Sequence, residues 1–151
     1  MFNIVDYMPS VVVIFISLIF RNHIFTEIGG NGFSVPAARV NKVKWMYAQA
    51  IGPKILLKIG ISVFAFSAIY NICARFFEPL QNIASFMPWI TLVLALGGLI
   101  VVNKEVDAFS PEWLSDDEKC DDWVEKAIGY ANNKQYKELH EFVKNTKMNK
   151  H

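Results

Sequence analysis

The side chains that could perform chemistry are scattered along this chain without the spacing that catalysis or metal binding needs. The three histidines, at 23, 140 and 151, and the two cysteines, Cys73 and Cys120, do not fall at the intervals of a metal site. Serines and acids are also present, but no nucleophile elbow and no H-E-x-x-H motif accompanies them. We therefore expect no enzyme activity, no catalytic residue, no metal and no cofactor.

A glycine cluster at 29, 30 and 32 is of a type that can hold phosphate through backbone N–H groups. No predicted strand precedes it and no Gly-Lys-Ser/Thr sequence follows it, so we interpret it as a flexible turn. The net charge of the chain is only +1, and its Lys and Arg residues form no block. We therefore expect no nucleic acid partner.

Residues 32–54 combine cationic and aromatic side chains in a way that is typical of a membrane surface. Apolar residues recur there at helical spacing. The cations that fall mostly off this stripe are Arg39, Lys42 and Lys44. We predict an amphipathic helix over about residues 35–51 that lies in the membrane interface. The alternative is a short amphipathic helix that packs on a soluble core.

The ends of this interfacial helix are predicted from residues with known preferences. Ser34 and Pro36 favour a helix start, as a cap and as a residue of the first turn. Gly52 followed by Pro53 favours a helix end. We therefore expect the chain to leave the interface there and to enter a separate membrane span.

Apolar runs frame this segment on both sides, and 53% of the 151 residues are hydrophobic. We predict spans at about residues 5–25, 54–76 and 84–103, since a helix needs about 20 apolar residues to cross a bilayer. Asp6 precedes the first run and Arg21 follows it, a charge order that favours an uncleaved anchor over a cleaved signal peptide.

The distribution of Lys and Arg between the spans predicts the orientation. Only Arg75 stands between the second and third spans. Between the first and second stand Arg21, Arg39, Lys42, Lys44 and Lys54. We therefore expect the N-terminus outside and the C-terminus in the cytoplasm.

Residues 110–151 change to a charged composition, and we predict a helical hairpin for them. Ser115 and Glu118 have the spacing of a capping box, and Asn132-Asn133 separates two stretches with apolar stripes. A lone hairpin cannot bury both of its apolar faces, so it must pack on the membrane domain, on a second copy or on a partner. Its first helix is acidic, and we hypothesise that this face docks on the cationic side chains of residues 39–44.

The predicted fold is thus an all-α membrane protein in two parts. The membrane domain, residues 1–109, has three transmembrane helices and the amphipathic interfacial helix between the first and the second. Residues 110–151 form the cytoplasmic hairpin. The partner that this architecture demands is a lipid bilayer.

The segment at 32–54 also resembles the signature of the SdpI family. The matching residues are Gly32, Phe33, Asn41, Trp45, Tyr47, Ala48, Gln49 and Lys54. Ser34 stands where the family usually has Arg, Gln49 where it has Asn, and Pro53 where it has Gly. The resemblance extends over about residues 32–109. It implies a multi-pass protein of the bacterial cytoplasmic membrane that gives immunity to a secreted toxic peptide or bacteriocin.

The resemblance implies a partner surface at each side of the membrane. The candidates for contact with a toxin are Tyr70, Asn71, Arg75, Phe76 and Phe77. Arg39, Lys42 and Lys44, together with the tail at 110–151, are the candidates for holding a cytosolic regulator. One alternative is a structural or assembly subunit whose hairpin docks a cytosolic partner, and another is a small oligomeric pore or transporter. For Asn71, a helix-to-helix contact within the bundle is the competing interpretation.

Overall fold

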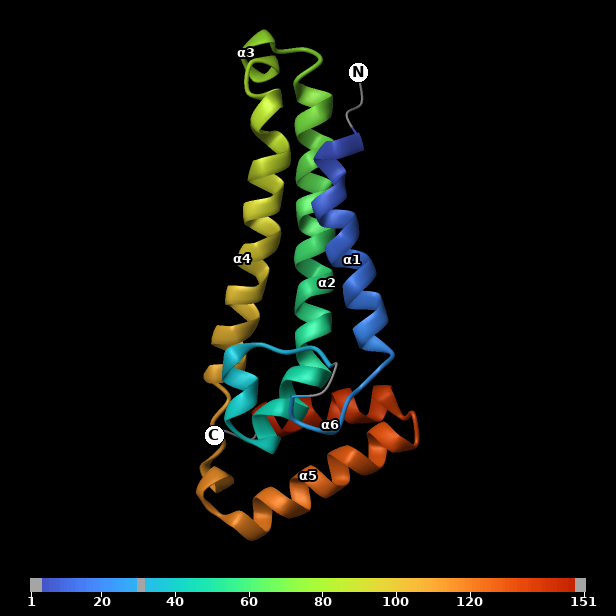
Figure 1. Ribbon diagram of the computed structural model, residues 1–151, viewed down its shortest axis with the longest axis vertical. Coiled ribbons are helices and arrows are strands. Elements are labelled where there is room, and N and C mark those ends of the chain that lie inside the picture. Colours follow the sequence, from blue (N-terminus) through green and yellow to red (C-terminus); the bar gives the residue numbers. More distant parts are fainter. Residues whose placement is uncertain (1–3, 30–31, 149–151) are drawn as a thin grey trace.

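The computed structural model describes residues 4–29 and 32–148, and these residues form a helical protein (Figure 1). The helices are α1 (Met8–Arg21), α2 (Lys42–Cys73), α3 (Glu78–Gln81), α4 (Met87–Asp107), α5 (Asp117–Asn132) and α6 (Tyr136–Met148). Short 3₁₀ turns are η1 (Ile4–Tyr7), η2 (Pro36–Val40), η3 (Ala84–Phe86) and η4 (Glu112–Ser115). In Figure 1, α1, α2 and α4 run side by side along the long axis, and α5 and α6 lie across one end.

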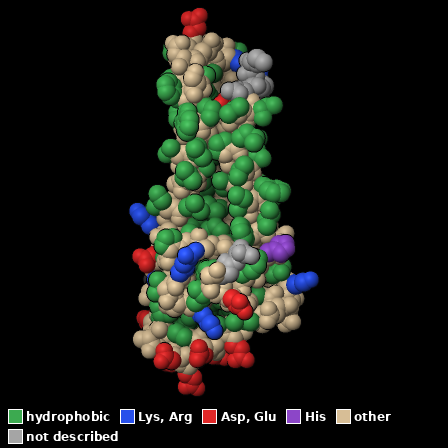
Figure 2. Space-filling view, viewed as in Figure 1, with side chains coloured by type: hydrophobic (Ala, Val, Ile, Leu, Met, Phe, Trp, Pro, Cys, Tyr) green, Lys and Arg blue, Asp and Glu red, His purple; other side chains and the backbone are tan. Residues whose placement is uncertain are grey.

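Three helical segments are long and apolar enough to cross a membrane: Ile4–Arg21, Lys42–Cys73 and Glu78–Asp107. Apolar side chains cover the middle of the bundle, and charged ones gather towards its two ends (Figure 2). Many large apolar side chains point outward, among them Phe15, Ile69 and Val93, which are between 62% and 67% exposed. Apolar surface of this extent needs lipid around it. The three predicted spans are confirmed, and the architecture is that of a multi-pass membrane protein.

Small residues let α2 approach both of its neighbours closely. A Cβ atom on Gly60 would lie 2.9 Å from Cγ1 of Ile14 in α1. A Cβ atom on Gly98 of α4 would lie 3.1 Å from Cδ2 of Leu56 in α2. Close backbone approach of this kind is a common way for helices to associate in lipid, where no hydrophobic effect drives them together. α2 is therefore the central helix, on which α1 and α4 pack.

Replacing Gly60 by valine is expected to destabilise the bundle by about 1–3 kcal/mol, because the new side chain must push α1 away from α2. Gly97→Val is the matched control, since a Cβ atom on Gly97 meets nothing within 4 Å. Unfolding in detergent, followed by circular dichroism, measures both variants. Equal loss of stability in the two would contradict the close packing at Gly60.

The predicted boundary at Gly52-Pro53 is wrong. Residues 36–40 form the turn η2, Asn41 caps α2, and α2 then continues for 32 residues through Pro53 to Cys73. A proline inside a helix removes one backbone hydrogen bond and bends the helix rather than always ending it. The lower end of α2 is inclined to its upper part in Figure 1. Both Gly52 and Pro53 are buried, so packing on either side holds the helix together.

The interfacial position predicted for residues 35–51 is also wrong, and the packed alternative is closer to the structure. Residues 45–50 are each at most 1% exposed, so every face of this part of α2 is covered. The loop before α2 covers one side, and the end of α4 and the hairpin cover others. The sequence shows only one apolar stripe because the other faces of this helix include Ala, Gln and Tyr. These residues can be buried without being strongly hydrophobic.

The predicted hairpin is confirmed, and it packs on the membrane domain through aromatic rings. The ring of Tyr47 in α2 stacks on Phe109 at a centroid distance of 3.8 Å. Phe109 contacts Trp123 of α5, and Trp123 stacks on Phe142 of α6. Five further hairpin side chains are buried with them: Val124, Ala127, Ala131, Leu139 and Val143.

Two details of the hairpin differ from the prediction. The cap of α5 is Asp116, whose carboxylate accepts from the backbone N of Lys119, while Ser115 belongs to the preceding turn. Among the described residues, the ion pairs of the acidic helix are with Lys119 and Lys126 of that helix. Lys44 pairs instead with Asp107 at the end of α4, at 3.4 Å. The hairpin therefore docks through apolar packing, and the hypothesis of an acidic docking face is not supported.

Candidate functional site

The residues of the predicted motif meet around the first half of α2. The side chain of Gln49 holds the backbone of Phe33: Nε2 donates to the Phe33 carbonyl at 2.6 Å, and Oε1 accepts from its N–H at 3.3 Å. A Cβ atom on Gly32 would lie 2.7 Å from Nε2 of Gln49, and one on Gly52 would lie 2.3 Å from the Phe33 ring. Glycine at both positions makes room for this clamp.

Of three further motif residues, two attach neighbouring segments to α2 and one caps the helix. The Trp45 indole donates from Nε1 to the carbonyl of Phe25 at 2.7 Å. The Asn41 carboxamide accepts from the backbone N of Lys44 at 2.8 Å and so caps α2. The Tyr47 hydroxyl donates to Oε1 of Glu105 in α4 at 2.8 Å. Ala48 is fully buried among them. The motif thus builds the folded end of the bundle, while Lys54 lies apart and faces α6.

Gln49→Leu is expected to destabilise this end by about 2–4 kcal/mol, since it leaves two buried backbone groups of Phe33 without partners. Gln49→Glu is the control that keeps an acceptor for the Phe33 N–H but loses the donor. Protease digestion of the segment before α2, compared with wild type, measures the effect. Unchanged digestion of the Leu variant would contradict the clamp.

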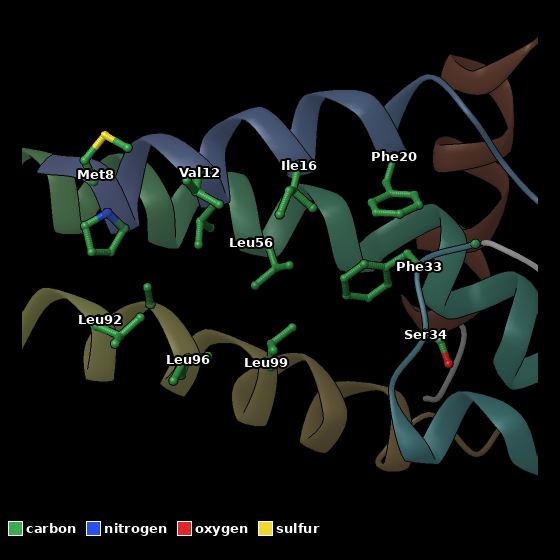
Figure 3. Close-up of a pocket in the computed structure, with 14 residues that line it drawn as sticks. Met8, Val12, Ile16, Phe20, Phe33, Ser34, Leu56, Leu92, Leu96 and Leu99 are labelled. Atoms are coloured by element: carbon green, nitrogen blue, oxygen red, sulfur yellow. The ribbon is translucent and has the colours of Figure 1, made fainter. Parts of the chain in front are cut away.

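An apolar groove runs along the bundle between α1 and α4, with α2 as its floor (Figure 3). Its volume is about 490 Å³. The labelled apolar side chains along it are Met8, Val12, Ile16, Phe20, Phe33, Leu56, Leu92, Leu96 and Leu99. Val12 and Leu96 are also exposed on the surface of the bundle. The groove therefore opens sideways, towards the position of lipid.

The groove ends differently at its two extremes. At the end near the hairpin, the rings of Phe20 and Phe33 meet edge to face at 6.2 Å, and Ser34 lies beside them. The Ser34 hydroxyl accepts from Nε of Arg39 at 2.9 Å. At the opposite end, Met8 and Pro9 line it next to the turn η1. The arrangement suits an apolar chain or peptide segment.

The residues predicted to contact a toxin fall into two groups. The Asn71 amide donates to Oδ2 of Asp6 and to the carbonyl of Ser67, and the Tyr70 hydroxyl donates to the carbonyl of Leu80. Their polar atoms thus hold the bundle together, and Asn71 has the helix-to-helix contact that was the competing interpretation. The exposed group is Arg75, Phe76 and Phe77, in the turn between α2 and α4.

The cationic candidates also differ from one another. Arg39 and Lys42 are exposed, and Arg39 donates to Ser34. Lys44 is largely buried and pairs with Asp107. Only Arg39 and Lys42 are therefore accessible in the way a partner surface requires.

Two buried polar residues were missed by sequence reasoning. Asp6 is 2% exposed, and its Oδ2 accepts from Asn71. The only signal for it was an acid in front of an apolar run. His140 is also buried. It follows Tyr136 by four residues and precedes Val143 by three, spacing that places it on the inner face of α6.

Comparison of the chain with protein-family models, with curated proteins and with solved structures gives no match.

Proposed function

We propose that this chain is an integral membrane protein of the immunity type, which binds an apolar toxic peptide within the bilayer. The observation that carries the proposal is the lateral groove between α1 and α4. Its volume lies within the range of about 300–1,000 Å³ that is usual for ligand pockets. A peptide that has inserted into lipid reaches such a groove from the side, without crossing the protein.

The orientation completes the proposal. The Lys/Arg distribution favours an outer N-terminus and an outer turn between α2 and α4, with the hairpin in the cytoplasm. Phe76 and Phe77 in that turn are 78% and 60% exposed, so they are available as first contacts for an arriving peptide. Arg39 and Lys42 at the other end are available to a cytosolic regulator. A bacterial cytoplasmic membrane, which the resemblance to the SdpI family implies, is part of the proposal.

Survival of a toxin-sensitive bacterial strain tests the proposal. The wild-type protein should protect the strain, and Leu96→Trp should reduce protection because the indole fills the groove. Val93→Trp is the matched control, since Val93 lies on the same helix, is 67% exposed and does not line the groove. Absence of protection against every cognate peptide, or equal protection by both variants, would contradict the proposal.

An assembly subunit is the second candidate, and one observation favours it. Trp113, Trp123 and Phe142 line a cleft of about 420 Å³ on the hairpin, which has room for a partner side chain. Other apolar side chains of the hairpin, such as Val124, Leu139 and Val143, are already buried in the core. Copurification of the full chain with one soluble complex, abolished by Trp113→Ala, would favour this candidate.

A further inference from the structure

A third cavity, of about 330 Å³, lies where the end of α1, the middle of α2 and the start of α6 meet. In Figure 1 this is the region beneath the lower end of α1, where α6 begins. Its charged lining residues are Arg21, Lys54, Lys134, Lys137 and Glu138, and His140 and Tyr136 line it as well. Residues from both the membrane domain and the hairpin therefore contribute to one cavity.

The cavity carries an excess of positive charge. Four of its side chains are cationic and one is a carboxylate. None of the four cations takes part in the ion pairs found among the described residues. Lys134 also holds a φ of 57°, a left-handed conformation that is usually taken by Gly or Asn. Glu138 in the cavity and Glu141 near Lys54 offset only part of this positive charge. The remaining cations repel one another, and an anion between them would relieve that repulsion.

His140 adds a buried polar group to this cavity. It is 7% exposed, and neither ring nitrogen has a partner within normal hydrogen-bond geometry, although the Ala50 backbone lies close enough to favour the charged ring slightly. Burial, and then the charges of Lys54 and Arg21, lower the pKa of His140 to about 4. The ring is therefore neutral near pH 7 and has one N–H to donate.

The start of α6 supplies further donors. The helix has 13 residues, and its first three, Tyr136, Lys137 and Glu138, line the cavity. The first N–H groups of a helix have no acceptor within the helix, and the helix dipole makes this end attractive to anions. Backbone N–H groups, a neutral imidazole and mobile ammonium groups are the donors that bind phosphate oxygens.

We propose that this cavity binds a phosphate group, either the headgroup phosphate of an anionic lipid or free phosphate. Arg21 and Lys54 stand on the membrane-spanning helices, while Lys137 and His140 stand on the hairpin. A phosphate held between them joins the two parts of the protein. Binding therefore stabilises the docked hairpin against release from the bundle.

The test uses the full chain in nanodiscs of phosphatidylcholine, with thermal release of the hairpin followed by tryptophan fluorescence. Inorganic phosphate is the first probe, and sodium chloride at equal ionic strength controls for screening. Nanodiscs that also contain phosphatidylglycerol are the second probe, and native mass spectrometry shows whether this lipid is retained. Neither readout needs a toxic peptide, so the result is independent of the proposed immunity function.

The double variant Lys54→Gln/Lys137→Gln should weaken the response roughly tenfold or more, as expected for the loss of charged hydrogen-bond donors. Lys42→Gln/Lys104→Gln removes the same charge from exposed positions outside the cavity and should respond as wild type does. A response to inorganic phosphate identifies free phosphate as a ligand, and retention of phosphatidylglycerol alone identifies the headgroup. No response of the wild-type protein to either probe, or an equal response of both double variants, would overturn the proposal.

Discussion

Replacement of Trp45 by alanine is expected to lower the free energy of unfolding by about 3–5 kcal/mol, the usual cost of emptying a large buried aromatic site. The Trp45 side chain is fully buried in the part of α2 that the loop, α4 and the hairpin all cover. The substitution opens a cavity and also leaves the Phe25 carbonyl without its indole donor. Because this cluster joins the bundle to the hairpin, we expect both to loosen together.

The control for this experiment is Trp45→Phe, which keeps most of the ring volume and loses the indole N–H. Its expected cost is smaller, about 1–3 kcal/mol, mainly for the unsatisfied carbonyl of Phe25. Denaturant unfolding in detergent, followed by circular dichroism, avoids dependence on the tryptophan that is removed. An alanine variant as stable as wild type would show that residues 45–50 do not form the core of the folded end.

The same cluster shows where sequence reasoning succeeds and where it fails. The three spans could be predicted because lipid imposes length and apolarity on every helix that crosses it. The break between α5 and α6 could be predicted because Asn132-Asn133 interrupts two apolar stripes. Burial of residues 45–50 could not, since the layers that cover them come from the loop before α2 and from the distant residues 109–143.

The Gly52-Pro53 error has a related cause. Glycine and proline disfavour a helix interior, but tertiary packing can override that preference. Here Gly52 is required by the Phe33 ring, which leaves no room for a Cβ atom. The helix therefore continues through a sequence that would often end one. The motif residues were listed from the sequence, but their contacts with Phe25, Phe33 and Glu105 depend on how segments far apart in sequence fold together.

The cavities are the least predictable part of the molecule. The groove forms between the facing sides of α1 and α4. Its shape depends on the close contacts of α2 with its neighbours at Gly60 and Gly98, and a hydropathy pattern does not reveal such contacts. The cationic cavity joins Arg21, Lys54 and Lys137, residues that are spread over most of the chain. Of the residues that line the cavities, only His140 could be placed from the residue spacing, which puts it on the inner face of α6.

Lowering the pH from about 6.5 towards 4 is expected to release the hairpin, with a loss of up to about 3 kcal/mol from His140 alone. The pKa of His140 falls from 6.5 to about 4 in the folded protein, so in this interval the unfolded chain binds a proton that the folded chain does not. The stabilisation is complete above pH 6.5 and declines as the pH falls towards 4. The cations facing the ring, chiefly Lys54 and Arg21, oppose its protonation, while Glu138 is the carboxylate in the same cavity.

The experiment compares wild type with His140→Leu, which cannot take up the proton, in a buffer without phosphate. A phosphate buffer would favour a charged ring if the cavity binds phosphate, and so would reduce the pH dependence being measured. Between pH 6.5 and 5 few carboxylates titrate, and the difference between the two proteins isolates the imidazole. Tryptophan fluorescence and limited proteolysis both report the docked hairpin. The idea fails if the stability of the Leu variant follows the same pH dependence as wild type, since the ring would then be protonated without cost in the docked state.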